Sequence, residues 1–177
     1  MNTTSASPAS LLDLPPIETA RCVLAALRIE DAAALQMLTD DPVITEAISF
    51  LGGRFRLADA EALIAKQVAG SDAFMGIWDR DSGRLAGMIG AHLRGTDDIE
   101  IGYWIGIGFR GRGYAGEAAA ALVAMLRELF PARHIIAECR PENRASWAIL
   151  ARLGFVPTGA DGQRPGRKRL SLPDPCG

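Results

Sequence analysis

The stretch "GFRGRGYAGEAAAALVAML", from Gly108 to Leu126, places four glycines and two arginines directly before an alanine-rich run. The run predicts a helix from about Gly113 to Leu129. Glycines allow positive φ angles and close approach of the backbone. Free N–H groups at a helix start point at a bound anion, which the helix dipole also favours. The stretch therefore predicts an anion site, to which Arg110 and Arg112 add two permanent positive charges.

The same glycines also match the dinucleotide-binding pattern G-x-G-x-x-G, at positions 111, 113 and 116. That pattern belongs to a parallel βαβ unit with an acidic residue about 20 positions further on, which Glu138 would supply. However, the strand before the loop is expected to end an antiparallel meander, and a long stretch of unrelated pattern precedes it. A nucleotide-dependent oxidoreductase is therefore the weaker interpretation of this loop.

The chain around the loop predicts a mixed α/β domain. Three apolar segments within residues 73–107 are separated by the turns "RDSG" and "GTDD", which predicts an antiparallel meander. Asn143 can cap the last helix at its N-terminus, and Gly154 suits its C-terminus. We expect strands at 19–27, 73–79, 84–94, 99–107 and 134–140, a closing hairpin from 155–159 and 167–172, and helices at 31–38, after Pro42, at 57–68, 113–129 and 143–153.

Length and composition indicate one globular domain, expected at residues 17–177 after a flexible lead-in at 1–16. The formal net charge of −2 does not favour a nucleic-acid surface. The three cysteines are odd in number and not clustered, which favours a reducing compartment over a disulfide framework. The longest apolar run, Ala118 to Leu126, is too short to cross a membrane, and the N-terminus does not look like a secretory signal. We therefore expect a cytoplasmic protein with no membrane and no nucleic-acid partner.

Other catalytic patterns find little support. The sequence contains no His-Glu-x-x-His, no Cys-x-x-Cys and no Walker lysine, so no metal is expected. The only histidines, His92 and His134, fall in predicted strands, which favours a packed or surface role over catalysis. Cys139 is more typical of a small buried apolar residue than of a nucleophile.

Two segments together carry a family resemblance. Residues 99–122, "IEIGYWIGIGFRGRGYAGEAAAAL", and 142–156, "ENRASWAILARLGFV", resemble the GNAT superfamily of N-acetyltransferases. Residues 17–35, "IETARCVLAALRIEDAAAL", are similar to the branch that contains the ribosomal-protein alanine N-acetyltransferases. The resemblance implies the α/β (α+β) GNAT fold, in which a mixed, twisted sheet has an antiparallel meander, then a βαβ-like half and a closing hairpin.

The resemblance also implies acetyl-CoA as the co-substrate. The strand matching Ile99 to Ile107 would splay from the next strand, and the pantetheine arm would lie in the gap. The pyrophosphate would sit on the N–H groups of the glycine loop, while Asn143 and Ser146 face the thioester end. The implied cofactor-binding residues are Trp104, Ile105, Ile107, Arg110, Gly111, Arg112, Gly113, Tyr114, Ala115, Gly116, Asn143 and Ser146.

Two residues are implied as catalytic. Glu100 occupies the position often assigned as general base, and strand alternation places Gly102 and Trp104 on its face. Many family members have a tyrosine acid where this chain has Leu150, so Ser146 is the substitute candidate. Without the resemblance, Glu100 would be read as the wet face of a strand, and Ser146 as a helix cap.

The expected function is the direct transfer of an acetyl group to a primary amine. A peptide N-terminus and a small amine both remain open as the acceptor, and an oligomer is possible. A catalytically idle acyl-CoA-binding regulatory module is the alternative from another class, because the family tyrosine is missing.

Overall fold

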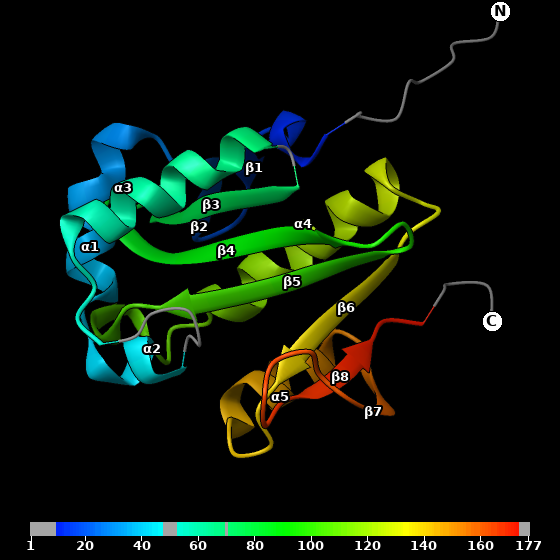
Figure 1. The fold of residues 1–177 in the computed structure, drawn as a ribbon. Helices are drawn as coiled ribbons and strands as arrows, with labels where there is room; N and C mark the ends of the chain where they lie inside the picture. Colours follow the sequence, from blue (N-terminus) through cyan, green and yellow to red (C-terminus); the bar gives the residue numbers. More distant parts are fainter. Residues whose placement is uncertain (1–9, 48–52, 70, 174–177) are drawn as a thin grey trace, which may run out of the picture.

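The computed structural model describes residues 10–47, 53–69 and 71–173. These residues form a sheet of eight strands in the order β1-β2-β3-β4-β5-β6-β8-β7 (Figure 1). All neighbouring strands are antiparallel except β5 and β6, which are parallel. The strands are β1 Ile17–Glu18, β2 Cys22–Ala26, β3 Asp72–Asp79, β4 Leu85–Arg94, β5 Asp98–Ile105, β6 His134–Cys139, β7 Val156–Asp161 and β8 Lys168–Ser171.

The predicted meander, the βαβ-like half and the closing hairpin are confirmed. The hairpin joins the sheet through its second strand, so β8 lies between β6 and β7. The α-helices are α1 Ala32–Thr39, α2 Pro42–Ala47, α3 Leu57–Ala65, α4 Tyr114–Leu129 and α5 Arg144–Arg152. The short 3-10 helices are Leu11–Asp13, Ile29–Asp31, Lys66–Ala69 and Ile107–Phe109.

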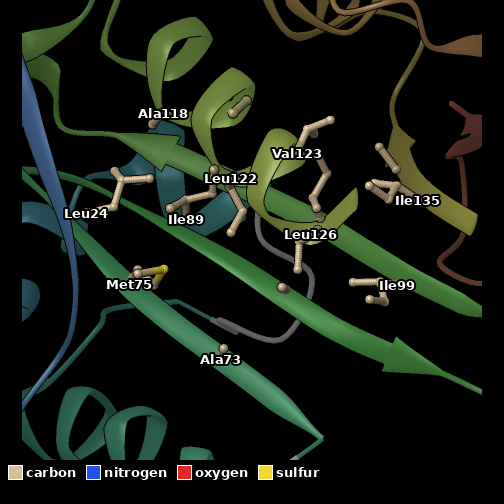
Figure 2. Close-up of a cluster of buried hydrophobic side chains, with 14 of the residues drawn as sticks. Leu24, Ala73, Met75, Ile89, Ile99, Ala118, Leu122, Val123, Leu126 and Ile135 are labelled. Carbon is tan, nitrogen blue, oxygen red and sulfur yellow. The ribbon is translucent and has the colours of Figure 1, made fainter. Parts of the chain in front are cut away.

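Helix α4 buries one apolar face against the sheet. Ala118, Leu122 and Leu126 recur at intervals of four residues and are fully buried, which is the pattern of an amphipathic helix. Ile99 and Ile101 of β5 lie in the same core cluster. Alternation along β5 then sends Glu100 to the opposite face. Figure 2 shows Ala118, Leu122, Val123 and Leu126 of α4 with Leu24, Ile89, Ile99 and Ile135 of the sheet.

The opposite face of the sheet carries a second core beneath α1 and α3. Leu35 of α1 and Leu63 of α3 pack there with Phe74 of β3 and Met88 of β4. Trp104 of β5 packs against the edge of this cluster. The face that carries Glu100 is therefore the face covered by α1 and α3.

The N-terminal region differs from the sequence prediction in two ways. Residues 1–9 of the predicted lead-in lie outside the described residues, but Leu11 and Leu14 of the lead-in are buried in the core. The strand expected at 19–27 spans only Cys22–Ala26, because residues 19–21 form a tight turn in which the N–H and the hydroxyl of Thr19 both donate to the Cys22 carbonyl. The turn places Arg21 outside the strand.

None of the helices in the described part of the chain is long and apolar enough to cross a membrane.

Candidate active site

The centre of the sheet opens between β5 and β6. The two strands pair from Asp98 and His134 only as far as Ile101 and Ala137. Beyond that point β5 stays paired with β4 up to Ile105, and β6 stays paired with β8. The facing edges of β5 and β6 then diverge (Figure 1), so their backbone groups no longer bond to each other. An extended chain that carries amide groups can pair with such free edges.

The glycine loop begins α4 at the open end of β5. Gly113 is the N-cap residue with a φ of 86°, and Gly111 has a φ of 73°. Side chains other than glycine rarely adopt these angles. The first N–H groups of a helix have no intrahelical acceptors. A Cβ built on Gly111 or Gly116 meets nothing within 4 Å, so the loop has free space on that side. The geometry fits the predicted pyrophosphate seat.

The side chain of Arg110 bonds to residues of the chain outside the glycine loop. Its Nε donates to the carbonyl of Ile105 at 3.0 Å, and its Nη2 lies 3.3 Å from the Asp41 carboxylate. The carbonyl of Ile105, one of the residues that the resemblance implies for cofactor binding, therefore already accepts a hydrogen bond from the chain itself. Arg112 stacks over the ring of Phe109, with 5.8 Å from its guanidinium carbon to the ring centroid.

Arg21 supports the loop, and sequence reasoning missed it. Its Nη1 donates to the carbonyl of Arg112 at 2.5 Å, and its Nε lies 3.3 Å from the Glu117 carboxylate. A Cβ built on Gly113 would overlap this guanidinium. The one sequence signal is that Arg21 lies in the segment 17–35 that carries the family resemblance, and nothing in that segment points to a contact with the loop.

On the other side of the opening, a hydroxyl pair connects β5 and α5. Asn143 caps α5 as predicted, since its side chain accepts from the Ser146 N–H at 3.1 Å. The Ser146 Oγ is 2.9 Å from the hydroxyl of Tyr103, which lies two residues beyond the last β5–β6 pair. Burial raises the pKa of Tyr103 to about 12, so the phenol is neutral at ordinary pH. Leu150, at the position where the resemblance implies a tyrosine acid in many family members, is buried in the core.

Glu100 is buried and held by two arginines. Its side chain is only 4% exposed, so it does not lie on a wet strand face. Its Oε2 accepts from the Nε of Arg94 at 2.8 Å, and its Oε1 bonds to Arg164 in the β7–β8 loop. Both carboxylate oxygens are therefore occupied by guanidinium groups.

Glu138 is a second buried carboxylate at this place, and the sequence singled it out only for the dinucleotide alternative. Its Oε2 accepts from the Nε of Arg164 at 3.0 Å, and its Oε1 accepts from the Gln163 N–H at 2.6 Å. Burial, followed by the charges of Arg167 and Arg94, lowers the pKa of Arg164 to about 10. Arg164 thus remains a cation at neutral pH and ties the β7–β8 loop to both carboxylates.

Free space lies beside Glu100, at Gly102 on the same face of the strand. A Cβ built on Gly102 meets nothing within 4 Å. Trp104 flanks the space on the same face and donates from its indole nitrogen to the Thr39 hydroxyl at 3.2 Å. Glu100, Gly102 and Trp104 thus line the face from which an acceptor would approach the opening.

Comparison with known proteins identifies the family. Residues 21–156 match the family described as "Acetyltransferase (GNAT) domain". The uncharacterized N-acetyltransferase YnaD of Bacillus subtilis (strain 168) is 28% identical over 140 residues, which cover 78% of this chain and 81% of that protein. The [Ribosomal protein uS5]-alanine N-acetyltransferase of Escherichia coli (strain K12) is 31% identical over 93 residues. That match covers 51% of this chain and about half, 48%, of the relative.

Solved structures share the fold. A GNAT-family acetyltransferase from Bacillus anthracis superposes with a TM-score of 0.79 at 22% identity, covering 90% of this chain and 99% of that one. The ribosomal L7/L12 α-N-protein acetyltransferase RimL, solved in complex with coenzyme A, gives a TM-score of 0.78 at 18% identity. Coverage there is 89% of this chain and 97% of RimL.

The fold, the opening between β5 and β6 and the family match agree. The chain belongs to the GNAT acetyltransferases. It is an N-acetyltransferase that uses acetyl-CoA. The residues assigned above to cofactor binding and catalysis stay predictions, and so does the cytoplasmic location. Within the described ranges, no three His, Cys, Asp or Glu side chains are grouped so that they could hold a metal ion.

Proposed function

We propose that this N-acetyltransferase modifies the α-amino group at the N-terminus of a peptide or protein. The observation that carries the proposal is the end of β5–β6 pairing at Ile101 and Ala137. Beyond this point the backbone N–H and C=O groups on the β6-facing edge of β5 no longer pair with β6 and can bond to the arm that carries the thioester. This edge lies beside the face that holds Glu100 and Gly102. The E. coli relative, a ribosomal-protein alanine N-acetyltransferase, supports a protein N-terminus as the acceptor.

The reaction needs no covalent enzyme intermediate, because a thioester is already activated for attack by an amine. The amine must be neutral to attack the thioester carbonyl. An α-amino group with a pKa near 7.7–8.0 loses its proton more easily than a lysine-type amine near 10.4. Backbone N–H groups on the unpaired stretch of β5 can donate to the carbonyl oxygen while negative charge develops on it. The protein therefore mainly positions the two substrates and moves protons.

Ser146 is the proposed hydrogen-bond donor to the departing sulfur. The neutral phenol of Tyr103 can donate to the Ser146 Oγ, which leaves the serine hydrogen free to point into the opening. Asn143 holds the start of α5 in place through the Ser146 N–H. The thiol is a fair leaving group with a pKa near 8.5, so this assistance is a modest part of the rate.

The family resemblance implies Glu100, on the opposite face, as the acceptor of the amine's proton, directly or through water. Because Arg94 and Arg164 occupy both carboxylate oxygens, this role requires Arg164 to release Oε1 when the acceptor arrives. An incoming ammonium can take over the place of the guanidinium, since both are cationic donors.

An acceptor panel tests the proposal. Acetyl-CoA is mixed with peptides that begin with alanine or serine, with a polyamine and with a lysine-containing peptide whose N-terminus is already acetylated. Thiol release and product mass are followed. We expect turnover with the free N-termini and none with the blocked peptide. Turnover of the polyamine alone would overturn the proposed acceptor but leave the acetyltransferase activity intact.

A further inference from the structure

His92 lies in the middle of the sheet, on the face that holds Glu100. The β-ladders pair it with Asp72 of β3 on one side and with Glu100 of β5 on the other. Its side chain is 15% exposed. The sequence favoured a packed or surface role for it, but the structure places it next to the proposed acceptor approach.

The hydrogen bond to Asp72 determines which ring nitrogen is basic. His92 Nδ1 is 2.7 Å from Asp72 Oδ1. A carboxylate only accepts hydrogen bonds, so Nδ1 must carry the hydrogen. In the neutral ring Nε2 then carries a lone pair and no hydrogen. The ring of Phe74 packs edge-on at 5.1 Å between centroids and helps to fix the imidazole plane.

The surroundings keep the His92 ring neutral. Burial lowers the pKa of His92, Asp72 raises it, and Arg94 and Arg164 lower it again, with a net result below the ordinary value. Glu100 also faces the ring across the β4–β5 ladder, but its charge is matched by the same two arginines. A base that is neutral at pH 7 can take a proton at once.

The tip of the His92 ring lies over the strand pair that leads to the free space of the site. A Cβ built on Gly90 would lie 2.7 Å from Nε2, so the tip of the ring lies over this glycine. Gly90 pairs directly with Gly102, where a Cβ would meet nothing. Gly102 is also the first residue of β5 beyond the last pair with β6. Within the described part of the chain, the ring bonds to Asp72 through Nδ1.

We propose that His92 Nε2, rather than the carboxylate of Glu100, accepts the proton of the acceptor amine, directly or through one water, and that Asp72 is its positioning residue. The proposal rests on the proposed function above. An N–H bond of the ammonium breaks, and its proton forms imidazolium on Nε2. The neutral nitrogen bonds to the thioester carbon, and the carbon–sulfur bond breaks with its electron pair going to sulfur. The second proton passes from the nitrogen to this sulfur, so coenzyme A leaves as the thiol and the nitrogen keeps one hydrogen in the amide. The Asp72 carboxylate stabilises the imidazolium, and Glu100 keeps its two arginines in place.

A pH–rate profile tests the assignment, with an alanine-starting peptide as the acceptor. In the unmodified protein kcat/KM should fall only at pH values below the ordinary histidine pKa of about 6.5, because the His92 pKa is lowered. In His92→Gln the fall should begin near pH 7.7–8.0, where the α-amino group itself gains its proton. The loss at pH 7 should be about 10²- to 10⁴-fold and should shrink as pH rises. His134→Gln, the matched control, should keep the original profile.

Chemical rescue distinguishes a lost base from a damaged fold. In His92→Ala, added imidazole should restore part of the rate, while acetyl-CoA should still raise the melting temperature as in the unmodified protein. Asp72→Asn should lower kcat with little change in the KM for acetyl-CoA and should move the acid limb of the profile. A pH-independent loss in both His92 variants without rescue would overturn the proposal.

A measurement on the unmodified protein does not need an acceptor. ¹⁵N-histidine NMR at pH 7 should show His92 neutral, with the hydrogen on Nδ1 and none on Nε2. A protonated ring, or a hydrogen on Nε2, would overturn the assignment while the acetyltransferase function stands. Absence of turnover with every acceptor in the panel would instead overturn the proposed function, and the role of His92 with it.

Discussion

The two sides of the proposed active site are built in different ways. The cofactor side is a continuous segment, residues 108–116 followed by α4, and it works through backbone N–H groups and positive φ angles. The acceptor side is a cluster of ionisable side chains around two buried carboxylates: Asp72, His92, Arg94, Glu100, Glu138 and Arg164. These residues come from four strands and the β7–β8 loop. A substitution on the first side should therefore change ligand binding, and one on the second should change both stability and proton transfer.

The largest effect is expected from Glu100→Gln. Removing one partner of a buried ion pair typically costs about 3–5 kcal/mol, and the lower end applies because Arg94 and Arg164 are one-third exposed. Denaturant unfolding measures the loss. Because His92 takes the proton, the accompanying loss of activity should be similar at all pH values.

Glu138→Gln is the matched control, since it bonds to the same arginine from an equally buried position. It should destabilise the protein less, because the remaining amide oxygen can still accept from a backbone N–H of the β7–β8 loop, whereas the Glu100 oxygens bond to guanidinium groups. An activity loss in Glu100→Gln that shrinks with rising pH would return the role of base to Glu100.

Gly113→Val should abolish acetyl-CoA binding. Acetyl-CoA at a hundred times its dissociation constant should stabilise the unmodified fold by about 2.7 kcal/mol. Valine cannot adopt a φ of 86° without strain, and its Cβ would displace Arg21 from the loop. Thermal unfolding with and without acetyl-CoA measures the difference. Gly95→Val carries a similar backbone strain at φ 62° in the distant β4–β5 turn and should keep the shift. If acetyl-CoA raised the melting temperature equally in both variants, the loop would not be part of the acetyl-CoA site.

Ser146→Ala should lower kcat by roughly tenfold to a hundredfold, with the KM for acetyl-CoA nearly unchanged. Tyr103→Phe should act in the same direction, because it removes the partner of the Ser146 hydroxyl. The double variant should lose little more than Ser146→Ala alone. Tyr114→Phe is the control, because the Tyr114 hydroxyl donates to Asp79 and not to Ser146. The effect of Tyr114→Phe on kcat should therefore be additive with that of Ser146→Ala. If the effects of Tyr103→Phe and Ser146→Ala were fully additive, the two hydroxyls would act independently and the prediction would be wrong.

The smallest effect is a pH dependence of stability that comes from His92. Its pKa is lower in the folded state than in the unfolded chain, so the unfolded state binds the proton first as pH falls. This contribution is complete above about pH 6.5 and is lost as pH falls from there toward the lowered pKa. Each kcal/mol lost should lower the melting temperature by about 2–4 °C. Melting curves from pH 7.5 to 5 should show a smaller decline in His92→Gln than in the unmodified protein, and identical declines would contradict the neutral ring.

Local signals were sufficient for the cofactor side. The αL glycine before α4, the Asn143 cap and the positive φ of Gly154 all follow from preferences that a few neighbouring residues set. Alternation in "DIEIGYWIG" was enough to separate Glu100 from its apolar neighbours. Within the N-terminal region the same reasoning failed for Leu11 and Leu14, because a short apolar segment shows its burial only when the partner surface is known.

The sequence by itself determined the family, the meander with its βαβ-like half, and the helix ends, since each depends on spacing within one segment. Only the tertiary structure decided which charges meet. Arg21 reaches Glu117 and Arg164 reaches Glu100 across long chain separations. His92 acquires Asp72 as a partner through the β3–β4 register, and Tyr103 meets Ser146 across the opened sheet. Spacing along the chain carries no record of these pairs, because hydrogen bonds and ion pairs depend on distances that exist only once the strands are in register.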